Sequence, residues 1–169
     1  MVEEVADYWI LSSASDYLRD RSRTALHEKL TVTPAGGAQK AYMVASLTSQ
    51  HLNVVVLLDS EGASKKTQEE LVKSRLIRDQ NVVFVAEGFD SAVPAEADIE
   101  DLLDPAVYES LVRESYSKEL AGKTLSLNPA IPRIAKRFEA AFRDLGIQFY
   151  KTRPARLLPT KMGSERQQL

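Results

Sequence analysis

Hydrophobic and polar residues follow two alternating patterns along the chain. Short runs rich in β-branched residues, typical of buried strands, are separated by longer stretches in which apolar residues recur every three or four positions, as in amphipathic helices. The strand-like runs are 30–33, 53–58, 81–85 and 147–150. The helix-like stretches are 5–18, 38–50, 65–79, 99–103, 106–116, 129–145 and 155–162. Strands that alternate with helices of this length predict an α/β fold with a mainly parallel sheet flanked by helices.

The two ends of this pattern differ from a complete α/β domain. Such domains place a buried strand before the first helix, but only Met1 and Val2 precede Glu3 here. We therefore expect either a fragment of a longer protein or a domain that has lost its first strand. An uncovered sheet edge left by that strand would favour pairing of two chains into a homo-oligomer. At the other end, we expect one domain over residues 1–162 and a flexible tail over 163–169.

Charged residues recur where the predicted strands end. Carboxyl ends of parallel strands meet at one edge of a sheet, so these side chains are expected to converge there. The residues concerned are Glu3, Asp7, Asp59, Glu61, Asp98, Glu100 and Lys151. Clustered carboxylates repel one another unless a cation lies between them, and a divalent ion with oxygen ligands is the natural candidate. The sequence therefore predicts a metal site that a lysine faces.

Five motifs, taken in order, resemble a known family. They are VEEVADY (2–8), TPAGGA (33–38), LLDSEG (57–62), ADIEDL (97–102) and KTRPAR (151–156). Together they resemble the Toprim (topoisomerase–primase) domain in the version found in OLD-family ATP-dependent endonucleases. The resemblance implies a Toprim/Rossmann-like fold and metal-dependent cleavage of DNA. Glu4 stands where the family has a glycine, and Glu61 replaces the second aspartate of its Asp-x-Asp motif.

The resemblance also assigns roles to the charged residues. Glu3, Asp59 and Lys151 would be catalytic. The ligands of two Mg²⁺ or Mn²⁺ ions would be Glu3, Asp7, Asp59, Glu61, Asp98 and Glu100. The family further implies an ATPase domain or subunit as partner, in the same chain or in another.

The amino-acid composition bears on solubility, on DNA binding and on the kinds of metal site that are possible. The 169 residues are 44% hydrophobic and 27% charged, with a formal net charge of −2, which is ordinary for a water-soluble domain. Basic residues nevertheless gather near the C-terminus, where Arg153, Arg156 and Lys161 are candidates for binding the DNA backbone. Cysteine is absent, which excludes disulfides and thiolate metal sites. With neither a membrane span nor a signal peptide in the sequence, we expect a cytoplasmic protein.

Two other functions fit parts of the pattern. A receiver-type phospho-acceptor domain also combines an acidic pair (Glu3 and Glu4) with a strand-end aspartate (Asp59) and a strand-end lysine (Lys151). Against it, Ala86-Glu87 stands where receivers carry a hydroxyl residue after the strand at 81–85. A catalytically degenerate Toprim remnant that only binds nucleic acid or a partner is the other alternative.

Overall fold

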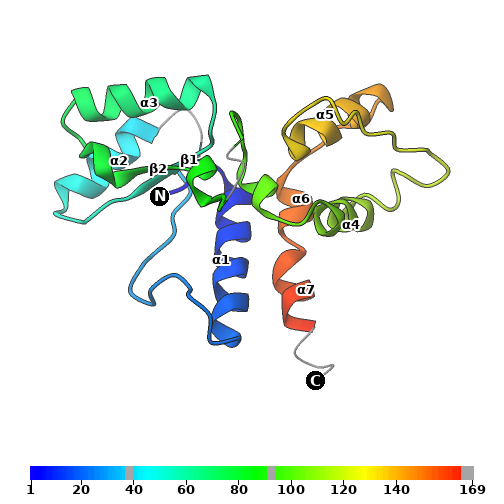
Figure 1. The fold of residues 1–169 in the computed structure, drawn as a ribbon, viewed down its shortest axis with the longest axis horizontal. Helices are drawn as coiled ribbons and strands as arrows, with labels where there is room; N and C mark the ends of the chain where they lie inside the picture. Colours follow the sequence, from blue (N-terminus) through cyan, green and yellow to red (C-terminus); the bar gives the residue numbers. More distant parts are fainter. Residues whose placement is uncertain (37–39, 91–93, 165–169) are drawn as a thin grey trace.

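The computed structural model describes residues 1–36, 40–90 and 94–164 and has a mixed α/β fold. On one side of Figure 1, a small parallel sheet of β1 (Val56–Leu58) and β2 (Val82–Phe84) lies with α2 (Lys40–Ser49) and α3 (Gly62–Lys73). On the other side lie α4 (Pro105–Ser115), α5 (Ile134–Asp144) and α6 (Thr152–Ala155). Between them, α1 (Val5–Asp20) packs against α6 and α7 (Leu158–Ser164). No helix in the described ranges is long and apolar enough to cross a membrane.

The first two residues extend the two-stranded sheet. β1 pairs in parallel with β2, with Leu57 opposite Val83. On the other edge of β1, the Met1 amine donates to the Val55 carbonyl (2.6 Å) and the Met1 carbonyl accepts from the Leu57 N–H (2.9 Å). Val2 then forms a parallel bridge with Pro34. Met1 and Val2 thus lie between β1 and the 33–35 segment, so a two-residue segment holds the place where a whole strand was expected.

Three hydrophobic clusters hold these elements together. One joins the sheet to α2 and α3 and contains Val44, Val54, Val56, Leu58, Leu71, Ile77 and Val82. A second joins α1 and α7 to the middle of the chain and contains Ala6, Ile10, Val85, Ala97, Ile99, Leu111, Ala155 and Leu158. The third, which we call the aromatic core, joins α4 to α5 and contains Tyr108, Val112, Tyr116, Leu125, Ile134, Phe138, Ala141 and Phe142. The charged residues of interest lie where α1, the sheet and the α4–α5 side come together.

Most predicted helices are confirmed, with shifted ends. α1 and α4 match their predicted spans closely, and Gly146 (φ +69°) follows α5 in the left-handed conformation expected after a helix. α5 begins only at Ile134, because the residue before Pro132 is disfavoured in helical geometry and Arg133 is still extended. α3 ends at Lys73, shortly before Arg75 takes a positive φ of 55°.

The remaining predicted elements differ in several ways. The predicted strands at 53–58 and 81–85 shorten to β1 and β2. The 30–33 segment forms no strand; its Thr33 carbonyl accepts from the Val2 N–H, next to the isolated bridge at Pro34. The predicted helix at 99–103 is the 3-10 helix η3 (Ile99–Leu102). α7 continues to Ser164, two residues into the expected tail, and the turn and helix start predicted at 37–39 lie outside the described residues.

The prediction of a strand at 147–150 is wrong. These residues form no strand, and the Tyr150 backbone pairs with a side chain, because its N–H donates to the Tyr116 hydroxyl at 2.6 Å. Phe149 stacks on Tyr116 and Phe138 of the aromatic core. The apolar run is therefore hydrophobic because it packs against helices. Residues 147–150 nevertheless place Lys151, which follows them, next to the acidic side chains.

Candidate metal and phosphate site

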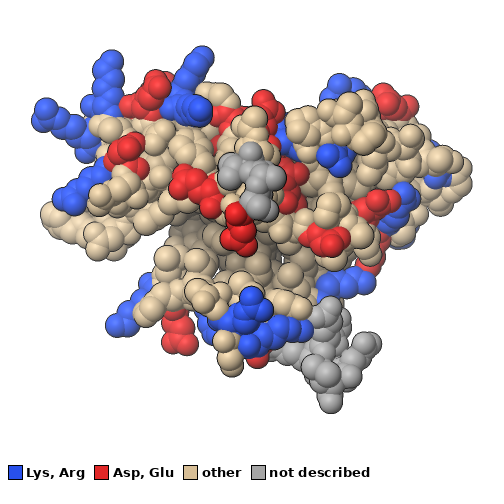
Figure 2. Space-filling model, in the orientation of Figure 1, with Lys and Arg blue, Asp and Glu red and all other residues tan. Residues whose placement is uncertain are grey.

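The acidic site consists of the six predicted carboxylates together with Lys151 and Arg133. The carboxylates are Glu3, Asp7, Asp59, Glu61, Asp98 and Glu100. They come from three separate parts of the chain, and acidic side chains gather in the middle of one face of the molecule (Figure 2). The basic members come from the start of α5 and from the residue that precedes α6.

The start of α1 positions the first acidic residues. Glu4 is the N-cap of α1, and its N–H donates to Asp7 Oδ2 at 2.7 Å. The other oxygen of Asp7, Oδ1, is buried and has no hydrogen-bond partner. Burial raises the pKa of Asp7 to about 6, against the opposing effect of its backbone hydrogen bond. Glu3 is also buried.

A short antiparallel bridge brings the second and third acidic pairs together. The Ser60 N–H donates to the Ala97 carbonyl at 2.8 Å, and the Ala97 N–H donates back at 3.1 Å. Asp59 and Asp98 are the sequence neighbours of these two residues, so the bridge aligns the end of β1 with the segment before η3. Burial, with further contributions from Asp98 and Asp7, raises the pKa of Asp59 to about 8 although Lys151 opposes the shift.

Asp98 and Glu100 are the most deeply buried acids of the site. Their exposed fractions are 1% and 0%. Asp101 fixes this segment, because its Oδ2 accepts from the Asp98 N–H at 2.8 Å and its Oδ1 accepts from the Ile134 N–H at 2.7 Å. Burial raises the pKa of Glu100 to about 7, again with Lys151 opposing. Tyr108 is buried nearby, and burial and the charge of Glu100 raise the pKa of its hydroxyl.

Lys151 is the cation that these acids share. Its Nζ lies 3.2 Å from Glu100 Oε2 and 3.8 Å from Asp98 Oδ2, and its side chain is only 15% exposed. Burial alone would lower the pKa of Lys151, but the charges of Glu100, Asp98 and Asp59 outweigh burial and raise it. Lys151 therefore stays protonated, and its charge also acts on Asp7.

Arg133 is a member of the site that the sequence analysis missed. Its Nη1 donates to Glu61 Oε2 and to Asp98 Oδ1, each at 2.8 Å, and its Nε lies 3.6 Å from Glu96 Oε2. Glu61 thus faces Arg133, and Asp98 contacts both cations. The only sequence signal was an arginine directly after Pro132, at a helix start, which is common in proteins of every function.

The acids of the site suit a divalent cation chemically. They supply carboxylate oxygens, which are the ligands that Mg²⁺ and Mn²⁺ prefer. Several buried oxygens lack a hydrogen-bond partner: Asp7 Oδ1, Asp98 Oδ2, Glu100 Oε1 and Glu100 Oε2. Within the described part of the chain, no group of three or more His, Cys, Asp and Glu side chains is already arranged to hold a metal ion. Coordination would therefore require these side chains to draw together around the ion.

The three basic residues predicted to bind DNA lie along α6 and α7. Arg153 pairs with Glu119 (2.7 Å) and lies 3.8 Å from the centroid of the Tyr116 ring. Lys161 pairs with Glu114 at 2.6 Å. Arg156 is exposed. Arg153 thus has a structural role, because it connects α6 to the end of α4, whereas Arg156 and Lys161 are exposed.

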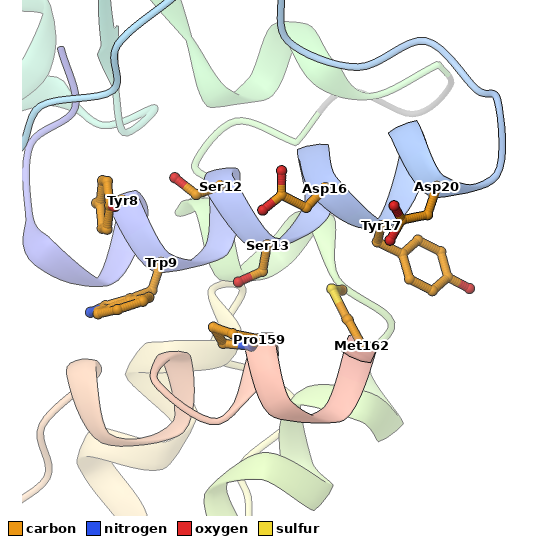
Figure 3. A pocket seen from close by; sticks show the side chains of 9 residues that line it. All are labelled: Tyr8, Trp9, Ser12, Ser13, Asp16, Tyr17, Asp20, Pro159 and Met162. Carbon is orange, nitrogen blue, oxygen red and sulfur yellow. The ribbon is translucent and has the colours of Figure 1, made fainter. Parts of the chain in front are cut away.

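A groove of about 240 Å³ lies between α1 and α7, away from the acidic site. Figure 3 shows Trp9 and Ser13 of α1 facing Pro159 and Met162 of α7. None of the six predicted metal ligands lines this groove. The chemistry of the predicted ligands is therefore not located in it.

Comparisons of the chain with protein-family models, with curated proteins and with solved structures find no match.

The raised pKa values predict an unusual dependence of stability on pH. Asp7, Glu100 and Asp59 keep protons in the folded state up to about pH 6, 7 and 8, whereas the unfolded chain loses them near pH 4. The unfolded state binds fewer protons in this window, so the free energy of unfolding should fall as pH rises, by about 1.4 kcal/mol per pH unit for each of the three groups that is still protonated in the folded state. Urea titrations between pH 4.5 and 8.5 without divalent ions measure this slope.

Asp59→Asn is the matched variant for that experiment. It removes the group that titrates latest, so the slope above about pH 7 should flatten. A wild-type stability that is constant or increases from pH 5 to 8 would contradict the expectation.

Proposed function

We propose that the chain is a metal-dependent phosphodiesterase module that cleaves DNA, of the Toprim kind found in OLD-family endonucleases. The observation that carries the proposal is the meeting of buried carboxylates from separate segments around Lys151. The unpartnered oxygens of Asp7 and Glu100 add to it, since buried polar atoms normally have partners in the folded protein.

Each group has a role in this proposal. Glu3, Asp7, Asp59 and Glu100 would hold Mg²⁺ or Mn²⁺, and the ion would activate water and stabilise charge on the phosphate. Lys151 lies among these acids, so its ammonium group would face the scissile phosphate and stabilise the negative charge that develops there. Arg156 and, after release from their acidic partners, Arg153 and Lys161 would bind neighbouring phosphates regardless of base sequence. Two ions, as the family implies, would also need Glu61 and Asp98 as ligands.

Nicking of supercoiled plasmid in Mg²⁺ or Mn²⁺ tests the proposal. We expect metal-dependent nicking that EDTA abolishes and that Asp59→Asn reduces by about 100-fold or more, because even partners of metal ligands contribute 10- to 100-fold. Asp144→Asn is the matched control, since Asp144 is an exposed aspartate at the end of α5. Equal nicking by wild type and Asp59→Asn would show that the cleavage belongs elsewhere. Binding of DNA without cleavage would favour the degenerate remnant, and labelling of Asp59 by acetyl phosphate would favour the receiver alternative.

A further inference from the structure

Arg133 neutralises the two acids that a second metal ion would need. Its guanidinium Nη1 bridges Glu61 Oε2 and Asp98 Oδ1 at 2.8 Å each, and its side chain is 14% exposed. Hydrogen bonds between charged groups are stronger than those between neutral groups. An ion that took both carboxylates would have to break two such bonds and would leave a largely buried guanidinium without a partner, which is costly.

The backbone around Arg133 holds this bridge in place. Arg133 is the extended N-cap of α5, and the next N–H, that of Ile134, donates to Asp101 Oδ1 at 2.7 Å. The other oxygen of Asp101 accepts from the N–H of Asp98. One carboxylate therefore ties the backbone beside Arg133 to the backbone of its partner Asp98. This arrangement favours a permanent ion pair over an incidental surface contact.

The other acids of the site do not contact Arg133. Asp7 Oδ1 and both carboxylate oxygens of Glu100 are buried without a hydrogen-bond partner. The charge of Lys151 acts on both of these acids, and it is shared with Asp98 and Asp59. Asp7 and Glu100 therefore have carboxylate oxygens that a cation could still take up, whereas Glu61 Oε2 and Asp98 Oδ1 are already paired with Arg133.

We propose that Arg133 is a positioning residue that takes the place of a second divalent ion, so that the acidic site binds one ion, beside Glu3, Asp7, Asp59 and Glu100. The inference rests on the proposed metal site and deepens it. Arg133 would hold Glu61 and Asp98 in fixed positions and prevent them from repelling each other. Glu61 is then not a metal ligand, in contrast to the prediction from sequence.

Mn²⁺ binding to the full chain tests this inference independently of cleavage. The number of bound ions is measured by equilibrium dialysis, in which electron paramagnetic resonance reports the concentration of free Mn²⁺. We expect one ion for wild type and two for Arg133→Met, because the substitution frees Glu61 and Asp98. Arg143→Met, on the exposed end of α5, is the control and should bind one ion. Two ions bound to wild type, or one ion bound to a folded Arg133→Met variant, would overturn the inference.

A second variant keeps the test decisive if Arg133→Met does not fold. Glu61→Gln retains an oxygen that accepts from Arg133, so the fold should be preserved, and we expect the same single ion with unchanged affinity. A loss of about tenfold or more in Mn²⁺ affinity would identify Glu61 as a ligand and overturn the inference. No Mn²⁺ binding by any variant would overturn both the metal site and this inference. Binding of one ion without DNA cleavage would overturn only the proposed nuclease function.

Discussion

Replacing Lys151 with methionine is expected to lower the free energy of unfolding at pH 8 by about 3–5 kcal/mol, the usual cost of removing one partner from a buried ion pair. Methionine fills similar space without the charge that lies 3.2 Å from Glu100 and 3.8 Å from Asp98. Without that charge, burial is no longer opposed, so the pKa values of Glu100 and Asp59 rise further. The folded state must then either bury uncompensated charge or take up protons.

The loss of stability in Lys151→Met should depend on pH. Below about pH 5 the buried carboxyls of the variant are protonated in the folded state, so the loss should be clearly smaller there than at pH 8. Urea denaturation of wild type and Lys151→Met at both pH values measures the difference. Lys123→Met, at an exposed loop lysine, should stay within about 0.5 kcal/mol of wild type. A loss that is the same at both pH values would mean that Lys151 stabilises the chain through packing of its side chain and not through its charge.

The second large effect is expected in the aromatic core. Phe138 is fully buried, with its ring 5.7 Å from the ring of Tyr108 and 6.1 Å from that of Phe149. Phe138→Ala should cost about 3–5 kcal/mol of unfolding free energy, because it removes a buried ring and leaves a cavity. Phe149 precedes Lys151 by two residues, so the same substitution should also loosen the lysine and weaken Mn²⁺ binding.

Substitution of an exposed aromatic residue is the control for Phe138→Ala, because it removes an aromatic ring without removing core packing. Tyr150 is 56% exposed, and Tyr150→Ala should change the unfolding free energy by at most about 0.5 kcal/mol. Chemical denaturation followed by circular dichroism measures both variants. Similar losses for Phe138→Ala and Tyr150→Ala would contradict the proposed arrangement of the aromatic core.

Local patterns predicted the helices and the parallel pair of strands well. The spacing of apolar residues in α1 and α4 and the continuous apolar runs of β1 and β2 are signals carried by neighbouring residues. The run at 147–150 carries the same signal as a strand, because Phe149 and Ile147 must be apolar to pack against the aromatic core. Periodicity alone does not reveal whether a short apolar run pairs with a strand or packs on helices.

Local sequence patterns likewise indicated some residues of the acidic site and not others. Asp59 and Lys151 stand out because each directly follows an apolar run, and the structure brings them within electrostatic reach of each other. Arg133 is 72 residues from Glu61 and 35 from Asp98, and no local pattern links them. Its role depends on where α5 begins, which is determined by Pro132 and by the hydrogen bond from the Ile134 N–H to Asp101.

The bridge between Val2 and Pro34 also limits how the sheet can grow. Val2 bonds to the Thr33 carbonyl and the Ala35 N–H, so in parallel pairing the backbone nitrogen of Pro34 faces the opposite, outer side. Proline has no hydrogen there to donate to an incoming strand. A second chain that paired along this edge would lack one backbone hydrogen bond at Pro34, which disfavours extension of the sheet there.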